Sequence, residues 1–279
     1  MKKWIAFLGL YFCLCLALGG CGQAPSPAEG GTGGAASPPA SMFSSPEASS
    51  DSGSASDTFR IIRYQDGVLL LARQGGAAAE VYTLTPEGGT EPAPDGAAPE
   101  EADRSWRPGA LAEITWSAAE ETFPARLCGV TAVRVLDSGF DDLCRLYSDV
   151  LEDLWTVDPG LNGGISELGV DLSRTGLSAS EQAAVAWAFG ERHGLPAILG
   201  TFEELAEQGL VDRDNLYWEN GCLFSITEDR TPSPDSGVIR FSAEKWRSGD
   251  GAYFFSDCTA VRDSGNSCGP YTVGSSAIS

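Results

Sequence analysis

Residues 59–72 read Phe-Arg-Ile-Ile-Arg-Tyr-Gln-Asp-Gly-Val-Leu-Leu-Leu-Ala, two apolar runs joined by an Asp-Gly pair. An Asp-Gly pair between apolar runs favours the two-residue turn of a tight β-hairpin. Further short apolar runs at 80–84, 110–116 and 125–136 predict three more strands. Short strands grouped in this way predict a small antiparallel, OB-like β-barrel over residues 58–136.

Beyond Asp137 the pattern becomes helical. Apolar residues recur at helical spacing from Phe140 to Leu154, and Ser138-x-x-Asp141 predicts a capping box before them. Similar capping patterns open two later segments. Helices are therefore predicted at 138–158, 178–194 and 201–209.

After Asp212 the pattern of strands returns, at 216–219, 222–227, 238–242, 252–261 and 268–273. The pair Asn220-Gly221 joins the first two and favours a type I′ hairpin. Helices grouped before strands predict that residues 137–279 form helices packed on an antiparallel sheet. The predicted fold class is thus α+β, with the barrel domain first.

The chain starts with Met1-Lys2-Lys3, continues with the largely apolar residues 4–18 and then reads Leu18-Gly19-Gly20-Cys21. This arrangement resembles a bacterial lipoprotein signal with its lipobox, and the apolar stretch is short for a membrane span. The resemblance implies that residues 1–20 are removed and that Cys21 becomes the lipidated first residue. Two acyl chains there would anchor the protein to the extracytoplasmic face of the cell membrane. The alternatives are an ordinary secretory signal that is cut at another small residue and a short uncleaved anchor.

Residues 22–56 consist mainly of Ser, Ala, Gly and Pro. Such a segment has too little apolar surface to offset the entropy of ordering. Residues 21–57 are therefore predicted to be a disordered tether between the anchor and the barrel.

A second resemblance covers part of the predicted barrel. Arg107-Pro108-Gly109, the strand at 111–116 and the segment Glu121-Thr122-Phe123-Pro124-Ala125-Arg126-Leu127 resemble the end of a small β-barrel domain of Gram-positive surface lipoproteins. The acidic loop that precedes them is longer than in many members of that family. The family has no established activity, so the resemblance implies a location and no catalytic residues.

The charge of the chain limits its partners. It has 39 acidic and 18 basic residues, a formal net charge of −21, and no run of basic residues follows Lys3. Nucleic acid binding needs a clustered basic patch, so nucleic acid is not expected as a partner. The expected partners are the membrane, through the lipid anchor, and a protein or another envelope component.

Catalytic motifs are scarce. His193 is the sole histidine, which excludes multi-histidine metal sites, and its place at the end of a predicted helix favours a role with the helix dipole. Paired acids occur at Asp141/Asp142, Glu152/Asp153 and Glu203/Glu204. Glycoside hydrolysis uses two carboxylates in a cleft, but adjacent acids on a helix are normally solvated. No cofactor is expected.

Two segments offer binding side chains. Asp212, Asp214 and Glu219 supply oxygen ligands that suit a weak Ca²⁺ site, although they lack the EF-hand spacing, and a plain acidic turn is the alternative.

Trp246, Arg247 and Tyr253 lie close together in the sequence and predict a recognition surface, because Trp, Tyr and Arg dominate interface energetics. The alternative is that Trp246 packs in the core while Lys245 and Arg247 face solvent.

Five cysteines follow Cys21, at 128, 144, 222, 258 and 268. An odd number cannot pair completely within one chain. Cys258 and Cys268 flank a turn-like Asp-Ser-Gly-Asn segment and are the best candidates for a disulfide, with buried free thiols as the alternative.

These features together predict a lipid-anchored extracytoplasmic protein with a non-catalytic binding or scaffold role. A solute-binding protein of a transporter also fits the anchor, but it needs two βα-rich lobes around a cleft. A hydrolase that uses paired carboxylates is the third hypothesis.

The lipid anchor makes a direct prediction. The variant Cys21→Ser removes the acylated thiol, so the protein should leave the membrane fraction and appear in the medium or the soluble fraction. Fractionation of cells followed by immunoblotting measures this change. Unchanged membrane association of Cys21→Ser would refute the lipoprotein hypothesis.

Overall fold

The computed structural model describes residues 54–86, 106–230 and 237–279. The signal, Cys21 and most of the predicted tether lie outside the described residues. Strand β1 begins at Ala55, inside the segment predicted as tether. Among the described helices, none combines the length and the hydrophobicity that a membrane span needs.

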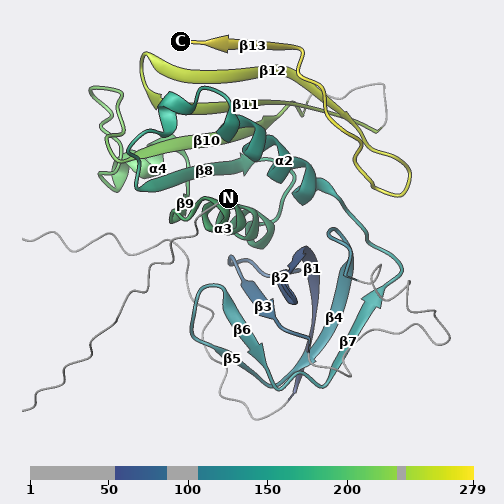
Figure 1. The fold of residues 1–279 in the computed structure, drawn as a ribbon. Helices are drawn as coiled ribbons and strands as arrows, with labels where there is room; N and C mark the ends of the chain where they lie inside the picture. The colour runs from purple at the N-terminus through teal and green to yellow at the C-terminus, as the bar shows by residue number, and fades with distance from the viewer. Residues whose placement is uncertain (1–53, 87–105, 231–236) are drawn as a thin grey trace, which may run out of the picture. The chain divides into compact units, whose positions relative to one another are not determined.

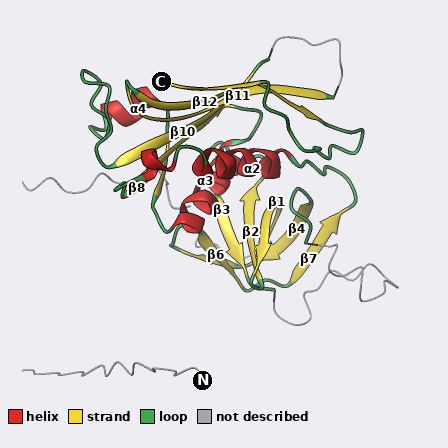
Figure 2. Cartoon of the chain, turned by 45° about the horizontal axis from the view of Figure 1, so that its top comes forward, coloured by secondary structure: helices red, strands yellow, loops and turns green. Residues whose placement is uncertain are grey.

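Two β-sheets lie on either side of a layer of helices (Figures 1 and 2). Sheet A has the strand order β5-β6-β3-β2-β1-β4-β7. Its strands are β1 (Ala55–Gln65), β2 (Val68–Arg73), β3 (Val81–Leu84), β4 (Leu111–Trp116), β5 (Ala118–Glu120), β6 (Ala125–Cys128) and β7 (Ala132–Leu136). The Asp-Gly hairpin is confirmed, because Asp66 and Gly67 both have positive φ between β1 and β2.

Sheet B has the order β13-β12-β11-β10-β8-β9. Its strands are β8 (Glu167–Arg174), β9 (Ala197–Leu199), β10 (Gly221–Glu228), β11 (Val238–Ser248), β12 (Gly251–Val261) and β13 (Ser275–Ile278). The chain is therefore mixed α+β and mostly β, which confirms the coarse fold class.

The described residues form the α-helices α2 (Leu143–Thr156), α3 (Ala179–His193) and α4 (Phe202–Glu207). Helices α2 and α3 contribute to the core between the two sheets, whereas α4 packs on a separate small core of sheet B. The 3-10 helix η1 (Pro159–Asn162) follows α2. The predicted capping boxes at Ser178 and Thr201 are confirmed, and α3 ends at Gly194 with φ +67°.

The predicted capping box at Ser138 is wrong. Helix α2 begins only at Leu143, whose backbone N–H is bound by the Asp141 carboxylate at 3.0 Å. Gly139 has φ +80°, which keeps the chain out of the helix before that point. Phe140 instead packs against the core of sheet A and lies 3.9 Å from the Arg107 guanidinium.

One hydrophobic core joins the two sheets through the helices. It contains Ile62, Leu70, Ala72 and Val81 from sheet A together with apolar residues of α2, α3 and sheet B. The opposite face of sheet A encloses a second core, which includes Phe59, Ile61, Leu69, Leu71 and Tyr82. The expected boundary at 136/137 is therefore not a gap between two separate cores.

The predicted closed antiparallel barrel is not found. Sheet A curls around its own core, but β5 and β7 are its two edges and β3 pairs with β6 in parallel. The single strand expected at 125–136 is broken at Gly129, where φ is +59°. The break sends β6 and β7 to opposite ends of the sheet, so the strands do not close on each other.

The predicted order of helices before an antiparallel sheet also needs correction. Strand β8 lies between α2 and α3, and it pairs in parallel with both β9 and β10. The hairpin expected at Asn220-Gly221 does not form, because residues 216–219 make no strand and the buried Trp218 ring lies against Gly221. Residues 268–273 make only isolated bridges, and the edge strand β13 follows them.

A buried ion pair links β1 to α3. Arg60 Nε donates to Glu181 Oε1 at 2.9 Å, and both side chains are 10% exposed. Arg60 Nη1 also donates to the carbonyl oxygens of Gly109 and Gly139. Burial opposes the charge on Glu181, but hydrogen bonds from Ser178 and Arg60 outweigh it and lower the pKa of Glu181 below its ordinary value.

Arg60→Met should destabilise the fold by about 3 kcal/mol, because Glu181 would be left buried with its main cationic partner removed. The pKa of Glu181 is depressed in the folded chain, so the stabilisation is present at neutral pH and is lost as the pH falls through the folded-state pKa. Urea unfolding at several pH values measures both effects.

The matched control is Arg134→Met. Arg134 pairs with Glu113 at 2.7 Å, but the two side chains are 69% and 41% exposed, so the loss should stay below about 1 kcal/mol. Equal losses in the two variants would contradict a special role for the buried pair.

Candidate binding groove

A hollow lies between sheet A and helix α3. Its volume is about 730 Å³. Strands β1, β2, β3 and β6 form its floor and α3 forms one wall. It is lined by Arg63, Gln65, Asp66, Val68, Leu70, Thr83, Thr85, Arg126, Trp187, Glu191 and Arg192. We call it the arginine groove, because three arginines from distant parts of the chain meet there.

The floor of the groove follows one row of paired residues across four neighbouring strands. Arg63 of β1 pairs with Leu70 of β2. Leu70 pairs with Thr83 of β3, and Thr83 pairs with Arg126 of β6. The row therefore has a guanidinium at each end, with an apolar side chain and a hydroxyl between them.

A β-bulge places Arg63 in this row. The β1–β2 register shifts between Ile61 and Arg63, so Ile61 faces the core of sheet A while Ile62 faces α3. A bulge adds one residue to a strand and changes the face of every residue that follows. Arg63 consequently lies on the same face as Arg60, which contacts α3 through Glu181.

Helix α3 holds Arg63 from the other side of the groove. The Arg63 guanidinium carbon lies 5.7 Å from the centre of the Trp187 ring, and Arg63 forms an ion pair with Glu191. Trp187 and Glu191 are one helical turn apart, so they share a face of α3. The Arg63 side chain is thus held while remaining 23% exposed.

The other two arginines are more exposed. Arg126 pairs with Glu120 at 2.5 Å, and Arg192 lies 3.3 Å from Glu152. Exposed pairs of this kind contribute little to stability and exchange easily with other partners. Within the described part of the chain, each arginine of the groove contacts one carboxylate, which leaves most of its N–H donors for a ligand.

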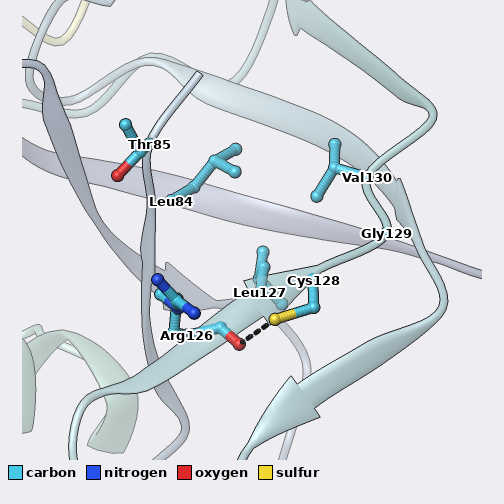
Figure 3. Close-up of a pocket in the computed structure, with 7 residues that line it drawn as sticks. All are labelled: Leu84, Thr85, Arg126, Leu127, Cys128, Gly129 and Val130. Atoms are coloured by element: carbon cyan, nitrogen blue, oxygen red, sulfur yellow. Dashed lines mark hydrogen bonds between the residues drawn. The ribbon is translucent and has the colours of Figure 1, made fainter. Parts of the chain in front are cut away.

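A second hollow of about 330 Å³ shares Thr85 and Arg126 with the groove (Figure 3). Leu84 and Leu127 line it and belong to the core of sheet A. The Cys128 thiol points to the carbonyl oxygen of Arg126, at 3.6 Å. Arg126 therefore stands between the two hollows.

The sequence did not reveal this groove. Its arginines lie at positions 63, 126 and 192, on β1, β6 and α3, and no local run or spacing connects them. Only the pairing of β6 with β3 and the docking of α3 on sheet A bring them together. The net charge of the whole chain is strongly negative and gives no indication of the three arginines that gather in the groove.

The predicted recognition residues have structural contacts. Arg247 donates to the carbonyl oxygens of Leu161, Gly163 and Glu219. Trp246 is half-buried in a small core below α4, with its ring centre 5.1 Å from that of Phe202.

Tyr253 packs edge-on against Phe255, with 5.7 Å between the ring centres. All three residues are in sheet B and none lines the arginine groove. They therefore stay a prediction without supporting site geometry.

Lys245 does not face solvent, although the packing alternative expected it to. It is fully buried, and its ammonium donates to the carbonyl oxygens of Val157 and Asp158 at 2.8 and 3.1 Å. These carbonyls lie at the end of α2, where backbone acceptors lack helical partners. Burial lowers the pKa of Lys245. The side chain thus caps α2 from inside the core instead of facing solvent.

The predicted Ca²⁺ site at Asp212, Asp214 and Glu219 is not formed. The Asp212 carboxylate accepts hydrogen bonds from the backbone N–H groups of Asp214 and Asn215 and from the Asn215 amide. These bonds, that of the Asn215 side chain above all, lower the pKa of Asp212. In the described residues, no three histidine, cysteine or acidic side chains gather as a metal would require.

The disulfide predicted between Cys258 and Cys268 is not formed, and both are free thiols. In the backbone pairing, Cys268 forms an isolated β-bridge with Arg262, whereas Cys258 of β12 lies opposite Phe241 of β11. The two cysteines are therefore not opposite each other. Both are buried in the shared core. Burial raises the pKa of each thiol to about 11.

The paired acids have structural partners. Asp141 forms an ion pair with Arg262, Asp142 binds Arg145, and Glu204 closes the cap of α4. The Tyr271 hydroxyl donates to Asp153.

His193, at the end of α3, lies 3.2 Å from Glu152 and is stacked on Trp155, with 3.9 Å between the ring centres. Burial lowers the pKa of His193 despite the nearby carboxylate of Glu152. Glu152 thus joins the end of α3 to α2.

Trp246→Ala tests whether this tryptophan is structural. Loss of its contact with Phe202 should destabilise the fold by about 2 kcal/mol, less than for a fully buried tryptophan, because Trp246 is only half-buried. Urea unfolding measures the loss. A variant of unchanged stability that no longer binds a ligand of the wild type would restore the recognition hypothesis.

Comparisons with known proteins add no relative. No protein-family model matches the chain, and no curated protein or solved structure is significantly similar to it. Function is therefore inferred from the arginine groove and from the sequence signals.

Proposed function

We propose that this protein is a lipid-anchored binding protein of the extracytoplasmic face of the cell membrane, and that it holds its ligand in the arginine groove. The lipobox at 18–21 and the Ser/Ala/Gly/Pro-rich segment behind it support the location. The likeness of residues 107–127 to a domain of Gram-positive surface lipoproteins agrees with it. The role is binding or scaffolding rather than catalysis.

The observation that carries the binding role is the row from Arg63 to Arg126 below Trp187. Binding sites combine apolar surface with a few fixed polar groups that orient the ligand. Trp187, Val68 and Leu70 supply the apolar part, and the guanidiniums supply donors in a planar fork. Arg63 is held in place by Trp187 and Glu191 before any ligand arrives, which reduces the entropy lost on binding.

The alternative functions lack such an observation. A solute-binding protein places its ligand between two βα-rich lobes, whereas sheet A is built from strands that follow one another without helices in its described part. A glycoside hydrolase needs two free carboxylates facing a shared cleft. Among the paired acids that suggested it, Asp141, Asp142 and Glu152 contact arginines, Asp153 contacts a tyrosine and Glu204 closes a helix cap.

Melting temperatures of the full-length protein test the proposal. The panel comprises amino acids, short peptides, envelope glycans and divalent cations. A ligand of the folded state stabilises it by about 2.7 kcal/mol at a hundredfold excess over its Kd. The wild type should melt a few degrees higher with at least one class, and Arg63→Ala/Arg126→Ala should not respond to it.

Arg134→Ala is the control, since it removes an exposed arginine of sheet A outside the groove and should respond like the wild type. A shift that survives in the double variant would place the ligand elsewhere. No shift with any member of the panel would contradict the proposed groove function.

A further inference from the structure

We infer that the arginine groove recognises a short extended peptide that carries two carboxylates four residues apart with an apolar side chain midway between them. This inference rests on the proposed function and names its ligand.

The ends of the groove select carboxylates. Guanidinium groups bind carboxylates through two parallel N–H···O bonds, and such charge-assisted bonds are stronger than neutral ones. Arg63 and Arg126 close the two ends of the row and each now contacts a single glutamate. The glutamates show which group these arginines accept, because their carboxylates already occupy part of each fork.

The separation of the ends sets the length of the ligand. Arg63 and Arg126 are three strand spacings apart, from β1 across β2 and β3 to β6. Neighbouring strands lie about 4.8 Å apart, so the row is about 14 Å long. An extended peptide advances about 3.4 Å per residue and directs every second side chain to one face. Residues i and i+4 therefore share a face and lie about 14 Å apart.

The middle of the groove suits residue i+2. Its side chain would lie over Leu70 and Thr83, next to Val68, which is 37% exposed, and the Trp187 ring. Burying an apolar side chain there removes Val68 and Trp187 from water. The hydroxyls of Thr83 and Thr85 and the amide of Gln65 can bind the peptide backbone. A small dicarboxylic acid is much shorter than this row and has no side chain to place over its middle.

The charge of the chain restricts the number of anionic groups. The formal net charge is −21, so a long polyanion would be repelled by most of the protein. A peptide with two carboxylates places its charges directly at the arginines and carries few elsewhere. The groove should therefore prefer it to phosphate polymers.

Isothermal titration calorimetry of the full-length protein tests this inference with three peptides. The first is acetyl-Glu-Ala-Leu-Ala-Glu-amide. The second replaces both glutamates by glutamines, which removes the charge. The third, acetyl-Glu-Glu-Leu-Ala-Ala-amide, keeps the charge and loses the spacing. The first peptide should bind at least tenfold more tightly than either of the others, and its affinity should fall with added salt.

Variants locate the binding. Arg63→Ala and Arg126→Ala should each weaken the first peptide at least tenfold, and Arg134→Ala should leave its affinity unchanged. Circular dichroism melting curves show that each variant is folded. Arg126 is exposed and Arg63 is partly exposed, and their ion-pair partners Glu120 and Glu191 are exposed, so removal of either arginine should keep the fold intact.

Each result has a separate meaning. Equal binding of the glutamine peptide, or of the peptide with adjacent acids, would overturn the inference. So would a lack of binding by the first peptide at about 1 mM. If another ligand from the melting panel still depends on Arg63 and Arg126, the proposed function stands and only the peptide inference fails. If no panel member binds, both fail.

Discussion

The buried ion pair between Arg60 and Glu181 fixes how sheet A meets helix α3, and the arginine groove depends on that position. Arg60 also binds the backbone at Gly109 and Gly139, so one side chain joins β1, the loop before β4 and the segment before α2 to the helix. Glu181 closes the cap of α3 with Ser178 at the same time. The strand and the helix start are thus held together, and Arg63 reaches Trp187 further along both elements.

Local signals in the sequence predicted the parts of the fold that depend on local energetics. The caps at Ser178 and Thr201 and the Asp66-Gly67 turn are satisfied by residues within a few positions of each other. The predicted cap at Ser138 does not form, because Phe140 packs against the core of sheet A, which is built from residues distant in the sequence. Strand β8 alternates the buried residues Leu168, Val170 and Leu172, a period-2 pattern that is short and lies between two strongly helical segments.

The candidate site was beyond prediction for a different reason. A cross-strand row depends on which strands are neighbours, and β6 pairs in parallel with β3 although β4 and β5 separate them in the chain. Lys245 is a similar case. It lies in β11 between Glu244 and Trp246, a context that does not indicate burial, and it is buried because its ammonium reaches the carbonyl groups at the end of α2. The roles of the groove arginines and of Lys245 therefore depend on residues that are close in space but distant in the sequence.

The β1 bulge has a consequence for how this chain can tolerate changes in length. In a regular strand, residues three positions apart face opposite sides. Arg60 and Arg63 share a face only because the extra residue at Ile62 interrupts the alternation. Loss of that residue could still preserve the pairing on both sides. After deletion of a different residue between Phe59 and Gln65, the strand can keep its pairing only by losing the bulge. If the bulge remains, one of the two arginines turns away from α3. Homologues of this chain, compared by insertions and deletions, should therefore differ in length at the hairpin turn rather than within β1.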